Sequence, residues 1–130
     1  MLLVKVELRK SDIDGLGCFT LEPIQKGQLL WVFDPRIDTR VRVSELNELP
    51  EAVQQYVKIY GFQEVVEGEP VYTMCGDHSK FMNHADAPNT MTDPENPLVE
   101  IAARDIQTGE ELTCNYFSFD SDARYKLAAG

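Results

Sequence analysis

The sequence predicts a mainly β domain with one short helical insert. Short apolar segments are separated by turns rich in Gly and Pro, a pattern typical of β-rich domains. Only one longer stretch carries apolar residues at helical spacing. A length of 130 residues, with 43% hydrophobic and 26% charged residues, fits a single globular domain over residues 1–130.

Strand and turn signals alternate through the first third of the chain. Residues 3–8 alternate apolar and charged side chains, which is the period of a half-buried strand. Residues 11–19 contain two Asp and two Gly and are interpreted as a turn. An apolar strand is expected over residues 28–33, whereas residues 34–43 are expected to be irregular.

The helical insert is expected at about residues 44–60. Apolar side chains recur there at three- and four-residue steps. Ser44 can cap the start, Pro50 can break the helix and Gly61 can end it.

Further strands are expected in the second half of the chain. They lie at residues 71–74, 98–102 and 111–116, with an irregular proline-containing connection before the second. The C-terminal tail, residues 117–130, is expected to contain a short helix over residues 120–129.

Charge and cysteine content restrict the partners and the compartment. Twelve Lys and Arg against 22 Asp and Glu give a net charge of −10, which argues against direct nucleic-acid binding and favours basic proteins as partners. Cys18, Cys75 and Cys114 suggest neither a disulfide framework nor a cysteine zinc site. No apolar run approaches the ~20 residues that cross a bilayer. We therefore expect no membrane contact and a cytoplasmic location, or a nuclear one in a eukaryote.

Three segments carry chemistry, and each has a plain structural interpretation when taken alone. Gly15-Leu16-Gly17 lets the backbone approach a ligand, but such pairs are commonly tight turns. His84-x-Asp86, with His78, resembles part of a facial iron site, but these side chains equally suit a hydrogen-bonded loop. Residues 103–116 are interpreted as two strands around a Gly turn, with Glu110 and Glu111 solvated.

In combination and in this order, the segments resemble the SET-domain family of protein lysine methyltransferases. The shared pattern is Gly-x-Gly followed by Phe, then Phe-[Ile/Met]-Asn-His-x-x-x-Pro-Asn, then Gly-Glu-Glu-Leu-Thr-x-x-Tyr, met here at residues 15–19, 81–89 and 109–116. The resemblance covers roughly residues 4–119. It implies small curved, β-clip-like sheets and a C-terminal pseudoknot that brings Asn83 and His84 beside Tyr116.

The resemblance also implies an activity and its residues. The expected reaction transfers a methyl group from S-adenosylmethionine (SAM) to a lysine amine in a basic protein, leaving S-adenosylhomocysteine. Tyr116 is the implied catalytic residue, and Phe117 and Phe119 are candidate walls of the substrate channel. The implied cofactor-binding residues are Gly15, Leu16, Gly17, Tyr72, Asn83 and His84.

Departures from the family pattern limit these expectations. Ala85-Asp86 stands where Ser-Cys is usual, and residues 117–130 contain no Cys, so we expect no metal. Closure of the lysine channel is then left to the tail, to a second copy in a homodimer, or to nothing. Two alternatives remain open: a non-enzymatic SET-like module that binds basic peptides through an acidic surface, and a His/Asp metal-dependent oxygenase.

Overall fold

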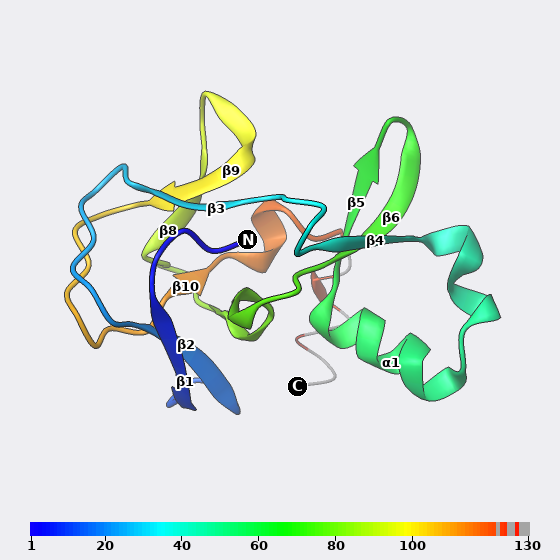
Figure 1. Cartoon of the computed structure of the whole chain (residues 1–130), viewed down its shortest axis with the longest axis horizontal. Helices are drawn as coiled ribbons and strands as arrows, with labels where there is room; N and C mark the ends of the chain where they lie inside the picture. The colour runs from blue at the N-terminus through cyan, green and yellow to red at the C-terminus, as the bar shows by residue number, and fades with distance from the viewer. Residues whose placement is uncertain (122, 125–126, 128–130) are drawn as a thin grey trace.

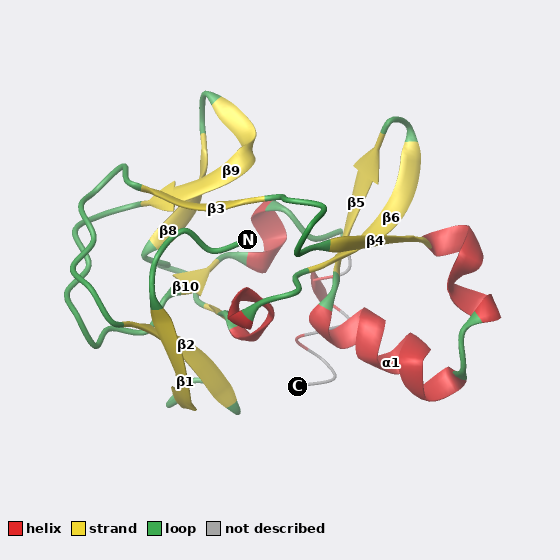
Figure 2. Cartoon of the chain, viewed as in Figure 1, coloured by secondary structure: helices red, strands yellow, loops and turns green. Residues whose placement is uncertain are grey.

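The computed structural model describes residues 1–121, 123, 124 and 127. Within them the protein is mainly β, as predicted, and its strands form four small sheets (Figure 1; Figure 2). The strands are β1 (Val6–Lys10), β2 (Leu16–Thr20), β3 (Leu29–Val32), β4 (Thr39–Arg42), β5 (Phe62–Val66), β6 (Glu69–Met74), β7 (Asn83–His84), β8 (Thr90–Asp93), β9 (Asn96–Ala102) and β10 (Thr113–Cys114). The helices are η1 (Val43–Glu48), α1 (Glu51–Tyr60), η2 (His78–Phe81) and η3 (Tyr116–Ser118).

The glycine segment lies in a hairpin rather than in one long turn. β1 and β2 pair antiparallel, with Lys10 opposite Leu16. The turn is confined to residues 11–15, where the Ser11 N–H donates to the Gly15 carbonyl at 2.8 Å and Gly15 adopts a φ of +47°. The expectation of a turn through residue 19 is therefore wrong, because residues 16–20 are ladder-paired.

The sheet β4-β6-β5 contains two strands that the sequence did not predict. Residues 39–42 are strand β4 rather than irregular chain, and their charged side chains pair across the sheet, Arg40 with Glu64 at 3.7 Å and Arg42 with Glu69 at 3.5 Å. The β5–β6 hairpin turns at residues 67–68, both with positive φ. Both strands are short and neither contains a fully buried residue, so neither carries a long apolar signal.

The helical segment forms where it was expected and is interrupted at the expected proline. η1 and α1 are separated by residues 49–50, and the carbonyl of Pro50 accepts the N–H groups of Val53 and Gln54. The Gly61 N–H closes α1 on the Val57 carbonyl at 2.8 Å. No helix within the described residues has the length and apolarity to cross a bilayer. Of the helix predicted for residues 120–129, residues 122, 125, 126, 128 and 129 lie outside the described residues, and residues 123, 124 and 127 are helical.

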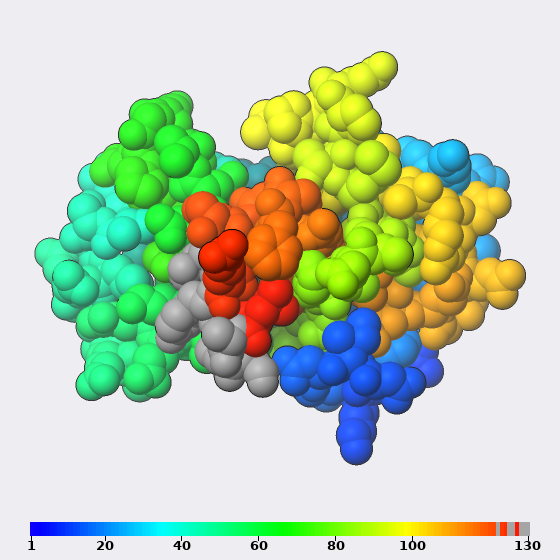
Figure 3. All heavy atoms as spheres, turned by 180° about the vertical axis from the view of Figure 1, so that it is seen from behind, coloured from blue at the N-terminus to red at the C-terminus, as the bar shows by residue number. Residues whose placement is uncertain are grey.

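Two apolar clusters flank the middle of the molecule. The larger is built by the β1–β3 and β8–β10 part of the chain, and the smaller by η1, α1 and β6. Seen from the opposite side, the segment that follows β10 runs between these two parts (Figure 3). The buried members of the larger cluster are Val4, Cys18, Ile24, Leu30, Ala102, Ile106 and Leu112, and those of the smaller are Leu46, Val57 and Tyr72.

A parallel strand pair joins the middle of the chain to its C-terminal part. β7 pairs with β10 so that Asn83 lies opposite Thr113 and His84 opposite Cys114. This pairing is the junction of the expected pseudoknot. It sets the positions of Asn83 and His84 relative to Tyr116, which follows β10.

Candidate functional site

The structure brings Asn83, His84 and Tyr116 together. The main-chain N–H of Tyr116 donates to Nδ1 of His84 at 3.1 Å, and the Tyr116 hydroxyl donates to the Met82 carbonyl at 2.7 Å. The two rings lie 5.3 Å apart between centroids. The predicted convergence of these residues follows from the β7–β10 pairing.

Asn83 ties this centre to the glycine hairpin. Its Nδ2 lies 3.0 Å from the Asp14 carbonyl, 3.2 Å from the Leu16 carbonyl and 2.9 Å from Oε2 of Glu111. The Ser11 hydroxyl lies 2.7 and 3.0 Å from the two oxygens of the same Glu111 carboxylate. Glu111 is therefore half-buried in a hydrogen-bond network and not solvated as expected.

Gly17 has a different role from the other two hairpin residues. Gly15 and Leu16 line a cavity beside Asn83, whereas Gly17 is not among its described lining residues. A Cβ at position 17 would overlap the Glu111 carboxylate and approach the Ser11 Cβ to 3.2 Å. Gly17 thus makes room for Glu111 rather than for a ligand.

We call the space beside Asn83 the glycine-loop cavity. Its volume is about 640 Å³. It is bounded by the β1–β2 turn, by the end of α1 and by residues 80–84, with Tyr116 in its wall. Its lining residues are Ile13, Asp14, Gly15, Leu16, Ile59, Tyr60, Lys80, Phe81, Met82, Asn83, His84, Tyr116 and Leu127.

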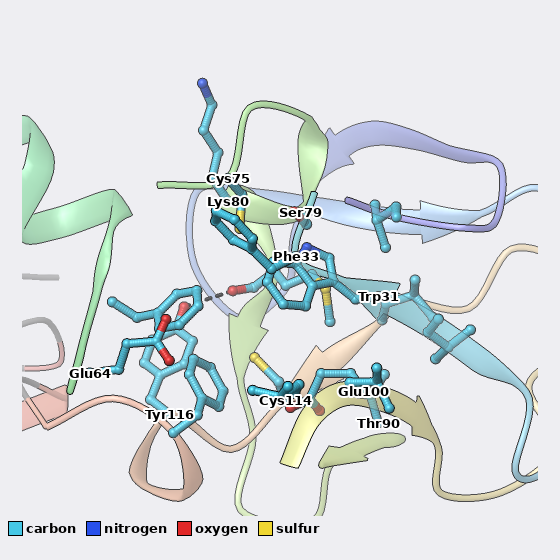
Figure 4. A pocket seen from close by; sticks show the side chains of 18 of the residues that line it. Trp31, Phe33, Glu64, Cys75, Ser79, Lys80, Thr90, Glu100, Cys114 and Tyr116 are labelled. Atoms are coloured by element: carbon cyan, nitrogen blue, oxygen red, sulfur yellow. Dashed lines mark hydrogen bonds between the residues drawn. The ribbon is translucent and has the colours of Figure 1, made fainter. Parts of the chain in front are cut away.

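A second space, the aromatic cavity (Figure 4), shares the lining residues Ile59, Tyr60, Lys80, Met82 and Tyr116 with the glycine-loop cavity. Its volume is about 130 Å³. Six aromatic rings line it, together with two carboxylates, Glu64 and Glu100, and two cations, Arg40 and Lys80. The rings are those of Trp31, Phe33, Tyr60, Phe62, Tyr116 and Phe119. Tyr116 lines both cavities, so a group in either space can contact it.

Two predicted site residues lie elsewhere. Phe119 lines the aromatic cavity, with its ring 5.2 Å from that of Phe62, whereas the other two lie outside both cavities. Phe117 is 57% exposed, packs edge-on against His84 and lines neither cavity. Tyr72 is buried with Leu46 in the smaller apolar cluster, so its expected contact with a cofactor is replaced by core packing.

The electrostatics of the centre keep the Tyr116 phenol neutral. Burial raises the pKa of Tyr116, and the nearby acidic groups Cys114, Asp120 and Asp14 raise it further. The hydroxyl is thus a proton donor to Met82 and not a phenolate. His84 accepts at Nδ1, which assigns the ring proton to Nε2, 3.0 Å from Oδ1 of Asp86.

The histidines do not form the facial metal site that was considered. His84 is paired with the exposed Asp86, while His78 begins η2 and its carbonyl accepts the Cys18 thiol at 2.8 Å. Among the described residues, no group of three His, Cys, Asp or Glu side chains is placed to hold a metal ion.

Comparison with known proteins assigns the family. A model of the SET domain matches residues 15–117 of the 130. The chain belongs to the SET-domain family. The matched region contains Tyr116, which lines both cavities, together with β7 and β10.

Relatives of this SET domain include much longer proteins. It is 30% identical over 124 residues to Histone-lysine N-methyltransferase 2D of Homo sapiens, which covers 90% of this chain. The chain spans about 2% of the length of that relative.

Solved structures share the SET fold. A Polycomb Repressive Complex 2 from Chaetomium thermophilum, bound to an inhibitor, matches 93% of this chain and 16% of that one, with a TM-score of 0.62 and 24% identity. A structure described as ctPRC2 in an autoinhibited conformation bound to S-adenosylmethionine matches 97% of this chain and 17% of that one, with a TM-score of 0.64 and 23% identity.

Some residues of the site were not found from the sequence. Met82 contributes a main-chain carbonyl, for which a sequence gives no signal. Glu111 was visible as a carboxylate next to an apolar strand, but only the fold brings it to Ser11, one hundred residues away. Trp31 and Glu100 come from strands of the same sheet and meet only through its register.

Proposed function

We propose that this SET domain transfers a methyl group from SAM to the side-chain amine of a lysine in a basic protein. The observation that carries the proposal is the position of Tyr116 between two cavities of different character. One is bordered by main-chain groups and the Asn83 amide, and the other is narrow and aromatic. Family membership and the SAM-bound structural neighbour support the same assignment.

The glycine-loop cavity fits the cofactor. Its volume of about 640 Å³ lies within the range of small-molecule sites. Gly15, Asn83 and Lys80 line it, with a flexible backbone, an amide and a cation that suit an amino acid joined to a nucleoside. When bound there, SAM would supply an electrophilic methyl group on a sulfonium.

The chain's own residues prepare the amine. A lysine amine ordinarily has a pKa of about 10.4, and an apolar environment lowers that pKa because burial disfavours the charged form. The rings of Phe62 and Phe119 provide an apolar surface next to Tyr116. The narrow walls of the aromatic cavity restrict the direction from which the nitrogen approaches, and such alignment supplies much of the rate of a displacement.

The substrate class follows from charge and from the relatives. A net charge of −10 attracts basic proteins over long distances. The matched relative is named as a histone-lysine methyltransferase, so histone-like lysine-rich tails are suitable first substrates. A cytoplasmic location and a homodimer that closes the channel stay predictions.

The test combines binding with methyl transfer. Calorimetry should detect SAM binding, and labelled SAM with a mixture of lysine-rich proteins should give methyl-lysine peptides in mass spectra. The absence of SAM binding at millimolar concentration would contradict the proposal. SAM binding without methyl-lysine would favour the alternative of a peptide-binding module.

A further inference from the structure

Trp31 and Glu100 form a cross-strand pair inside the aromatic cavity. They are direct partners in the antiparallel register of β3 and β9, and both line the cavity. Side chains of directly opposed residues stand on the same face of a sheet, about 5 Å apart at Cβ. An indole ring and a carboxylate are therefore fixed side by side by the backbone.

The carboxylate of Glu100 has no cationic partner. Its Oε1 accepts the Thr92 hydroxyl at 2.7 Å, but within the described residues no Lys, Arg or His side chain forms an ion pair with it. Burial raises its pKa, which is the behaviour of a charged group that has lost water without gaining a counter-charge. A bound cation would remove this cost.

The indole N–H of Trp31 also lacks a hydrogen-bond acceptor among the described residues. Its nitrogen, Nε1, is buried. Buried N–H groups are nearly always paired in proteins, so an unpaired one in a cavity wall needs an explanation. An acceptor on a bound peptide would supply the missing partner.

The same cavity shows how such a pair holds a cation. The guanidinium of Arg40 lies 3.6 Å from the centroid of the Phe33 ring and 3.7 Å from Oε2 of Glu64. A cation over a ring and beside a carboxylate gains from both contacts. Trp31 and Glu100 likewise place an aromatic ring beside a carboxylate, but no arginine of the described chain lies between them.

The pair is separate from the position expected for the reacting amine. Figure 4 places Tyr116 and Glu64 on one side of the aromatic cavity and Trp31 and Glu100 on the other. A carboxylate in contact with the reacting amine would hold it protonated, which opposes methyl transfer. Glu100 therefore suits a different positive group of the substrate.

We propose that Trp31 and Glu100 form a subsite for a second positively charged side chain, a lysine or arginine close in sequence to the target lysine. The identity of the occupant as part of a methylation substrate rests on the proposed function. The existence of a cation subsite rests on the two side chains alone.

Binding at the subsite can be measured without catalysis. Trp31 is the single tryptophan of the chain, so its fluorescence reports on this cavity. The probe is N-acetyl-arginine amide, and N-acetyl-citrulline amide is its neutral counterpart. We expect a saturable change with the first and none with the second.

The decisive variant is Glu100→Gln, which keeps an oxygen for Thr92 but removes the charge. It should weaken binding of the arginine probe at least about tenfold, the usual scale for losing a charged hydrogen-bond partner. Glu95→Gln, an exposed position in the turn between β8 and β9, is the matched control and should change binding less than about twofold. Unchanged binding in Glu100→Gln, with a native circular dichroism spectrum, would overturn the subsite.

Methylation kinetics then identify the occupant. Peptides with one target lysine and either arginine or citrulline beside it should differ in KM for the parent protein, with kcat little changed, and should not differ for Glu100→Gln. Arginine binding that depends on Glu100 in a protein that methylates no peptide would refute the proposed function and retain the subsite. If the parent protein and Glu100→Gln both methylate peptides with the same preference for arginine, the subsite is refuted and the proposed function is retained.

Discussion

The hydroxyl of Tyr116 donates a 2.7 Å hydrogen bond to the main-chain carbonyl of Met82, the residue that immediately precedes β7. The main-chain N–H of the same tyrosine is held by His84 at 3.1 Å. The phenol is thus fixed from both ends by one short segment. Its orientation between the two cavities depends on this double attachment.

Tyr116→Phe should separate chemistry from cofactor binding. Loss of the hydroxyl removes a group that orients the amine, and we expect methyl transfer to fall at least about a hundredfold, as for a positioned catalytic group. SAM affinity should stay within about threefold, because His84 holds the main chain and not the hydroxyl. Calorimetry and labelled transfer measure the two effects. Methyl transfer by Tyr116→Phe at the rate of the parent protein would remove the Tyr116 hydroxyl from the mechanism.

Phe119 and Phe117 should differ, although they are near neighbours and identical in type. Phe119 lines the aromatic cavity, whereas Phe117 packs outside it on His84. Phe119→Ala should raise KM for a lysine peptide by about tenfold or more, since aromatic wall contacts contribute about 1–2 kcal/mol. Phe117→Ala should change KM less than about threefold. A larger effect of Phe117→Ala would contradict the position of this ring outside the cavity.

Glu111→Gln should loosen the glycine hairpin. The amide of glutamine would bring an N–H₂ group against the Asn83 amide or the Ser11 hydroxyl, which are now donors to the carboxylate. We expect a loss of about 1–3 kcal/mol in the free energy of unfolding, the cost of an unsatisfied buried group, and weaker SAM binding. Urea unfolding and calorimetry measure these quantities. Glu110→Gln makes the same charge change beside Arg104 on the surface and should cost under about 1 kcal/mol.

The buried thiols should be unreactive and should make stability fall at high pH. Burial raises the pKa of Cys18 to about 12 and that of Cys75 to about 11. Below the ordinary thiol pKa the thiols are protonated in both the folded and the unfolded protein, so these groups do not make the free energy of unfolding depend on pH. Above about pH 9 the unfolded thiols ionise first, which favours unfolding as pH rises. Alkylation with peptide mapping at pH 8 should leave Cys18 and Cys75 unmodified in the native protein and modify both in urea. Rapid native modification would contradict their burial.

The sequence predicts the parts of this fold that depend on local signals. The helix broken at Pro50 and the apolar strand near Leu30 have such signals and are found in the structure. β4 and β5 are short strands without a fully buried residue, and part of their stabilisation comes from contacts across the sheet, such as that of Arg40 with Glu64. A contact between residues 24 positions apart leaves no local signal in the sequence.

The candidate site was predictable only through its motif residues. Asn83, His84 and Tyr116 converge as the family resemblance implied. Tyr72 was misplaced because an aromatic residue in a strand looks the same whether it faces a ligand or a core. The pairing of Trp31 with Glu100 depends on a bulge-shifted register between β3 and β9, which no local pattern encodes.

The parallel pairing of β7 with β10 has a consequence for biosynthesis. Twenty-eight residues, 85–112, separate these two short strands, so the pairing must await the emergence of residue 114 from the ribosome. Until then Tyr116 cannot lie beside Asn83 and His84, and the nascent chain lacks a complete ligand site. A ligand that binds the finished site would therefore act late, drawing the last strand into place and stabilising the entire domain rather than guiding its first folding steps.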